Sequence, residues 1–155
     1  MIADVVITPL KQICDRRGKV MHMLRSDSPI FMGFGEIYFS CIYPGMVKAW
    51  KLHREMTLNC AVPHGLVKFV MYDDRPNSLT RGEIQEIVTG PDHYCLITVP
   101  PMIWTGFQCI GQEMAILANC ATVGHDRAEA VTQDPSASSI PYEWSINMNA
   151  TVDRY

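Results

Sequence analysis

The chain lacks several features that would place it in a specialised class. Its formal net charge is −3 at pH 7, so it has no excess of basic residues with which a general nucleic-acid binder would displace counterions from phosphates. No apolar run reaches the roughly 20 residues that span a bilayer. The opening stretch MIADVVITPL carries Asp4 and no basic residues. We therefore expect no nucleic-acid partner, no membrane-spanning helix and no secretory signal.

Disulfide and helix signals are also missing. The six cysteines are spread along the chain without a CxxC pair, which favours buried thiols in a reducing cytoplasm over a disulfide framework. No window of a dozen residues keeps the i, i+3, i+4, i+7 apolar spacing of an amphipathic helix. What is present is a chain of 155 residues with 48% apolar and 19% charged residues. These values are typical of one globular domain, and we expect it to be cytoplasmic.

Strand signals recur instead, as short runs rich in Val, Ile, Tyr and Phe that end at Gly, Pro, Asn or Asp. The candidates are DVVITPL, GKVMHML, GEIYFSCIY, VKAWKLHR, MTLNCAV, GLVKFVMYD, EIQEIVTG, YCLITVPP, WTGFQCIG and EMAILANCAT. Their spacing of about 8–12 residues predicts an all-β sandwich or barrel. We predict a single domain over 1–155 with its core at about 15–123, and mostly loop and tail over 124–155.

His53 is the residue on which a functional reading depends. Metal-binding barrels of the jelly-roll type often use HxH on one strand, because residues i and i+2 point the same way. Here the sequence is Lys51-Leu52-His53, and one imidazole beside an ammonium is a poor site for a divalent metal, so we expect none. Two interpretations stay open. His53 is a hydrogen-bonded core residue, or His53 and Lys51 point together into the barrel mouth as proton acceptor and electrostatic helper.

The order of motifs resembles a known family. From about Asp15 to Trp144 the chain carries DRRG, a strand ending KLH, GLVKFVMYDDR before a polar loop, VPPMIWTGF, ILANCAT and IPYEW. This order is similar to that of the dTDP-4-dehydrorhamnose 3,5-epimerases. The resemblance implies a double-stranded β-helix (the RmlC-like cupin or jelly-roll fold). It also implies a homodimer and epimerisation of a 4-keto-6-deoxy sugar nucleotide without metal or organic cofactor.

The resemblance also implies roles for individual residues. His53 matches the family's catalytic histidine. The role of Lys51 as the cation that stabilises developing negative charge comes from its position beside His53 on the strand and not from the resemblance. Arg17, in DRRG, matches the arginine that contacts the nucleotide diphosphate. In the family that arginine comes from the neighbouring subunit, because the N-terminal strand crosses over in the dimer.

The chain departs from the family pattern at several positions. Trp50 stands where the family has an arginine, Thr57 where it has a lysine, and Thr105 where it has a second histidine. The family's tyrosine general acid has no counterpart, and Asn119 lies in that region. The tail whose aspartate orients the family histidine is also missing. We assign Trp104, Thr105, Thr57 and Asn119 to substrate binding and leave the general acid unassigned.

Three functions follow from these observations. The leading one is an isomerase or epimerase of a nucleotide-activated 4-keto-6-deoxy sugar, acting at C3, C5 or both. The second is a 3,4-ketoisomerase of the same fold, a group that usually presents two histidines where this strand has His53 alone. The third is a sugar-nucleotide-binding cupin without catalysis.

Overall fold

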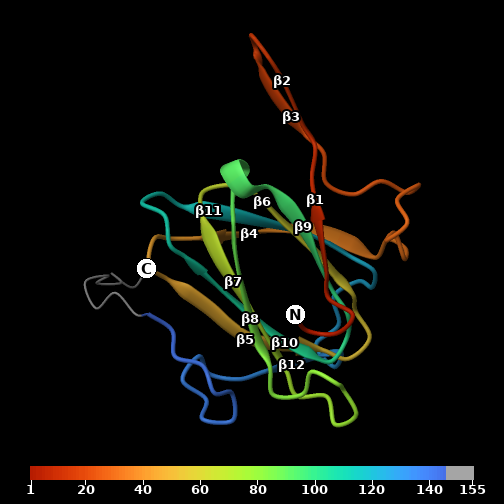
Figure 1. The fold of residues 1–155 in the computed structure, drawn as a ribbon, viewed down its shortest axis with the longest axis vertical. Helices are drawn as coiled ribbons and strands as arrows, with labels where there is room; N and C mark the ends of the chain where they lie inside the picture. Colours follow the sequence, from red (N-terminus) through yellow and green to blue (C-terminus); the bar gives the residue numbers. More distant parts are fainter. Residues whose placement is uncertain (146–155) are drawn as a thin grey trace.

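The computed structural model describes residues 1–145, which form an all-β barrel with a projecting hairpin (Figure 1). The only helical segment within that range is the three-residue turn η1, Pro91–His93, and nothing there is a helix that would cross a membrane. The strands are β1 Val6–Pro9, β2 Gln12–Asp15, β3 Gly18–Met21, β4 Glu36–Ile42, β5 Val47–His53, β6 Leu58–His64, β7 Val67–Asp73, β8 Ile84–Thr89, β9 Cys95–Val99, β10 Ile103–Cys109, β11 Ala115–Ala121 and β12 Ala130–Thr132.

Two five-stranded antiparallel sheets make the barrel. One has the order β1-β9-β6-β11-β4 and the other has the order β12-β5-β10-β7-β8. This arrangement confirms the predicted jelly-roll class. The ten predicted strands are all present, and most of them turn apolar side chains toward the core.

The main core lies between the two sheets and follows directly from that alternation. On β7, Val67, Phe69 and Met71 point inward and are at most 2% exposed. The opposite face of the same strand carries Lys68, Val70 and Tyr72, so it is not simply a solvent face.

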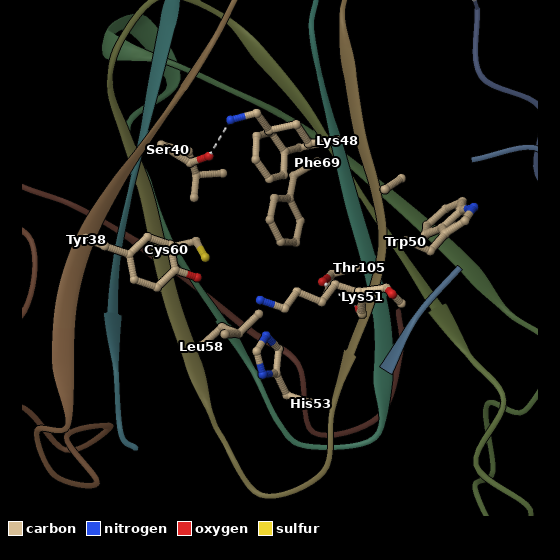
Figure 2. A pocket seen from close by; sticks show the side chains of 14 residues that line it. Tyr38, Ser40, Lys48, Trp50, Lys51, His53, Leu58, Cys60, Phe69 and Thr105 are labelled. Atoms are coloured by element: carbon tan, nitrogen blue, oxygen red, sulfur yellow. Dashed lines mark hydrogen bonds between the residues drawn. The ribbon is translucent and has the colours of Figure 1, made fainter. Parts of the chain in front are cut away.

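Residues after Gly124 contribute more than the loops that we expected. Much of the segment is irregular, but β12 pairs with β5 and extends the second sheet. Farther on, Ile140 and Trp144 are buried against the outer face of that sheet, where the Trp144 ring lies 5.0 Å from the ring of Trp50. This cluster explains why Trp50 is accommodated on β5: its side chain faces away from the barrel interior (Figure 2).

The β2–β3 hairpin extends away from the barrel (Figure 1). Its cross-strand pair Ile13 and Val20 is 47% and 59% exposed, so apolar side chains face solvent in the single chain. All six cysteines are free thiols, as expected, but only four are buried. Cys14 is exposed on the hairpin and Cys41 on the outer face of β4, so the expectation that all would be buried is wrong for these two.

Candidate active site

A cavity of about 370 Å³ opens between the two sheets. Strands β4, β6 and β11 form one wall, and β5, β7, β10 and β12 form the other. Its lining is mostly apolar, with Leu58, Phe69 and Phe107 among the walls, and a few polar side chains project into it (Figure 2). Such a composition is typical of small-molecule sites, where a few polar groups orient a ligand.

Lys51 and His53 both line this cavity, because they are two residues apart on β5 and share its inward face. Leu52 between them points outward into the cluster around Trp50. The Thr105 hydroxyl on β10 donates a 3.0 Å hydrogen bond to the Lys51 carbonyl and fixes the strand at this point. The alternation argument therefore placed these side chains correctly.

Glu129 holds the imidazole of His53. The Nδ1 atom of His53 lies 2.5 Å from Oε2 of Glu129, and both side chains are almost fully buried. The other carboxylate oxygen, Oε1, accepts hydrogen bonds of 3.0 Å from the backbone N–H groups of Glu55 and Met56. An ionised carboxylate can only accept, so Nδ1 carries a proton and Nε2 of neutral His53 is left as the basic atom.

The pKa values of this pair fit such an assignment. Burial works against the charged carboxylate, but the two backbone N–H groups and His53 outweigh it and lower the pKa of Glu129 to about 2. Burial lowers the pKa of His53 below 6.5, with smaller contributions from Lys51 and His125, while Glu129 acts in the opposite direction. His53 is therefore neutral at pH 7 and able to accept a proton.

The opposite wall carries Tyr38 on β4, whose hydroxyl is directed toward the Lys51 and His53 side (Figure 2). At the other end of the cavity, Nζ of Lys48 donates to Oγ of Ser40 at 3.0 Å and to the Cys41 carbonyl at 2.7 Å. Sequence reasoning assigned no role in the site to Glu129, Lys48 or Tyr38. Strand alternation on β4 was a signal for Tyr38 and Ser40, but nothing local to the sequence links Glu129 to His53.

The other predicted site residues are not all brought together. Thr105 lines the cavity. Trp104 is buried in the outer cluster with Trp50, and Asn119 is fully buried behind Tyr38. Thr57 is buried beside Thr122, whose hydroxyl accepts its backbone N–H.

Arg17 lies outside the cavity of its own chain. It is exposed in the turn of the hairpin, where its guanidinium pairs with Asp15 at 2.7 Å. Across residues 1–145 no group of three or more His, Cys, Asp and Glu side chains is arranged to hold a metal ion.

Comparison with known proteins places this geometry in context, although no family model matches the chain. A probable low-salt glycan biosynthesis epimerase (Agl13) of Haloferax volcanii is 35% identical over 144 residues, which cover 92% of this chain and 89% of the relative. The chain belongs to the RmlC-like family of dTDP-sugar epimerases and isomerases. The crystal structure of a dTDP sugar isomerase from Desulfovibrio desulfuricans is 42% identical, with a TM-score of 0.90 and 92% of each chain covered.

A third similarity concerns the fold alone. The crystal structure of an RmlC 3,5-epimerase from Legionella pneumophila, in complex with dTDP-4-keto-L-rhamnose, has a TM-score of 0.83 at 18% identity. The match covers 95% of this chain and 81% of the Legionella pneumophila chain. This RmlC-like protein therefore shares its barrel fold with that enzyme at low sequence identity.

Proposed function

We propose that this RmlC-like protein is an epimerase that inverts a carbon next to the keto group of a nucleotide-activated 4-keto-6-deoxy sugar. The observation that carries the proposal is the His53–Glu129 pair, which presents a neutral imidazole to a cavity that also contains the Lys51 ammonium. A ketone acidifies its neighbouring C–H bonds, so a single base and a cation beside the developing enolate oxygen are sufficient to begin the reaction.

The residues would act in the following order. Nε2 of His53 removes the proton from the carbon next to the ketone, and the C–H electron pair forms the C=C bond of an enolate. Glu129 stabilises the imidazolium that results, and the Lys51 ammonium stabilises the enolate oxygen. The return of a proton to the opposite face of the carbon restores the ketone with inverted configuration.

Hydrogen exchange tests the proposal. Wild-type protein incubated with dTDP-4-keto-6-deoxyglucose in deuterium oxide is expected to place deuterium at C3, C5 or both, measured by NMR and mass spectrometry. The H53A variant should lower the rate of label uptake by about 10²- to 10⁴-fold, the range for loss of a general base. H64A is the matched control, because His64 is half exposed outside the cavity.

Two other functions give different outcomes. The similarity to a dTDP sugar isomerase favours 3,4-ketoisomerisation as the second candidate, and a product whose carbonyl has moved from C4 to C3 would identify it. Thermal stabilisation by the sugar nucleotide, with no label uptake and no product, would contradict both enzyme proposals and favour a binding protein.

We also infer that the working unit is a cytoplasmic homodimer. The exposed pair Ile13 and Val20 on the hairpin is an apolar surface that a second copy would cover, and six free thiols suit a reducing compartment. In this arrangement the hairpin of one subunit delivers Arg17 to the diphosphate of a nucleotide bound in the other subunit. A guanidinium fork suits that task because it forms paired hydrogen bonds with phosphate oxygens.

A further inference from the structure

The unassigned step in the proposed reaction is the return of the proton, and the wall opposite His53 carries a group suited to it. Tyr38 lies on β4, in the first sheet, whereas His53 lies on β5, in the second. Both side chains line the same cavity (Figure 2). A sugar ring between these walls would therefore have the imidazole on one face and the phenol on the other.

A buried hydrogen-bond chain fixes the Tyr38 hydroxyl from behind. Nδ2 of Asn119 lies 3.0 Å from the Tyr38 oxygen, and Oδ1 of Asn119 accepts the backbone N–H of Asn59 at 2.9 Å. The side chain of Asn59 is itself fixed, because its Nδ2 donates to the Cys120 carbonyl and its Oδ1 accepts from the Thr98 hydroxyl. Both asparagines are fully buried, so this series of hydrogen bonds is shielded from water.

The donor-to-acceptor direction of these hydrogen bonds decides where the Tyr38 proton points. A backbone N–H can only donate, so the atom of Asn119 that faces Asn59 must be the oxygen, and the amide nitrogen must face Tyr38. The Tyr38 oxygen therefore accepts from Asn119, and its own O–H is left to donate elsewhere. No acceptor for that O–H occurs among the hydrogen bonds of the described residues, and the cavity lies on its open side.

The surroundings also suit a group that gives up a proton and recovers it. Burial raises the pKa of Tyr38, so the phenol is protonated at neutral pH, while the N–H of Asn119 stabilises the phenolate left after transfer. The Lys51 ammonium lines the same cavity and is directed toward the wall that carries Tyr38 (Figure 2).

We propose that Tyr38 is the general acid that returns a proton to the enolate carbon from the face opposite His53. This assignment rests on the proposed epimerase function. The carbon takes the phenolic proton into a new C–H bond, the enolate oxygen becomes the ketone again, and the site is left with a Tyr38 phenolate and a His53 imidazolium. Transfer of one proton from imidazolium to phenolate through solvent restores both groups, so neither oxidant nor co-reactant is required.

Y38F tests the assignment because it removes one hydroxyl and leaves the ring in place. In deuterium oxide, Y38F is expected to lower the formation of inverted product by about 100-fold or more. Deuterium should still enter the unreacted substrate with retained configuration, because His53 can remove and return a proton on its own face. Y43F is the matched control, since Tyr43 follows β4 and is 72% exposed outside the cavity.

The outcomes separate this assignment from the proposed function. Inversion by Y38F at the wild-type rate would overturn the role of Tyr38, and so would an equal loss of exchange and inversion, which would make Tyr38 a binding residue. Absence of exchange in the wild-type protein would instead refute the proposed epimerase function, and the acid assignment would fall with it.

Discussion

At the scale of single residues, the pairing of His53 with Glu129 sets how the proposed base responds to pH. The pKa of His53 lies below 6.5, so kcat/KM of the wild-type protein should decline only at pH values below that point. Glu129 raises the pKa of His53, which means that the pKa should fall further when the carboxylate is removed.

The E129Q variant tests this coupling. We expect kcat to fall by about 100-fold, since the imidazolium loses its stabilising partner and the ring its orientation. The acid limb of the kcat/KM profile should move to lower pH. E113Q is the matched control, because Glu113 and His64 form an exposed pair at 3.6 Å away from the cavity. An unchanged profile in E129Q would contradict a positioning role for Glu129.

The candidate site was predictable from the sequence only where a local rule applied. Alternation on one strand joined Lys51 to His53, and that geometry is what the structure has. The partner of His53 could not be predicted, because Glu129 is 76 residues away and reaches it through the pairing of β12 with β5. The same limit applies to Asn119, whose contact with Tyr38 depends on the neighbouring strands β11 and β4.

At the scale of elements, the two strands absent from the sequence prediction share a physical reason. β2, Gln12–Asp15, is mostly exposed, and β12, Ala130–Thr132, has only three residues. Neither has a run of alternating apolar residues. Both are strands because they form hydrogen bonds with a neighbouring strand, which a sequence pattern does not reveal. The ten predicted runs are richer in apolar residues, including GKVMHML, although its strand β3 has only four residues and is mostly exposed.

The projecting hairpin allows a test of the proposed dimer. R17A alone should raise KM for the sugar nucleotide by about 10- to 100-fold, because a guanidinium bond to phosphate is lost. K19A is the control, since Lys19 is a hairpin cation that bonds to Gln12.

Mixing the two impaired variants, assayed at a sugar-nucleotide concentration far below the KM of R17A, extends that test. If Arg17 acts on the neighbouring subunit, R17A and H53A refolded together should recover about a quarter of wild-type activity, because half of the dimers then contain one intact site. If Arg17 acts within its own chain, every site in the mixture is defective. Activity no higher than that of the separate variants would contradict the proposed exchange.

At the scale of the whole molecule, a buried carboxylate ties the N-terminal segment to the end of β7. Asp73 is fully buried and accepts from Arg75 at 2.9 Å, Ser78 at 2.6 Å and Thr80 at 2.7 Å. Arg75 in turn donates to Asp4 and to the Ala3 carbonyl, each at 2.9 Å. This cluster fixes a segment whose neighbouring apolar residues are part of the main core.

D73N should therefore destabilise the fold by about 3 kcal/mol, because it leaves buried donors without their charged partner. For a chain of this size the loss corresponds to a decrease in Tm of about 6–12 °C in calorimetry. D74N is the control, since Asp74 is half exposed. A Tm within about 2 °C of wild type would show that the cluster contributes little.

The same carboxylates set the acid sensitivity of the fold. Hydrogen bonds lower the pKa of Asp73 well below 3.8 and that of Glu129 to about 2, despite the opposing effect of burial. Stability from these groups is complete only above about pH 5 and is lost as the pH falls below the unfolded pKa values of 4.5 and 3.8, because the unfolded chain binds protons first. Unfolding by acid should accordingly be less steep in D73N than in the wild type.

Strand β4 has two different faces. Tyr38 projects from it into the cavity, whereas Ile37 and Phe39 on its outer face are 50% and 63% exposed. As the last strand of its sheet, β4 has a hydrogen-bonded neighbour on one side only. The proposed proton donor Tyr38 and the exposed apolar surface of Ile37 and Phe39 thus belong to the same edge strand. Loss of whatever covers that surface would therefore also make Tyr38 more mobile. Turnover per molecule should then decline when the protein is diluted enough for the proposed dimer to dissociate, and a crowding agent should restore it.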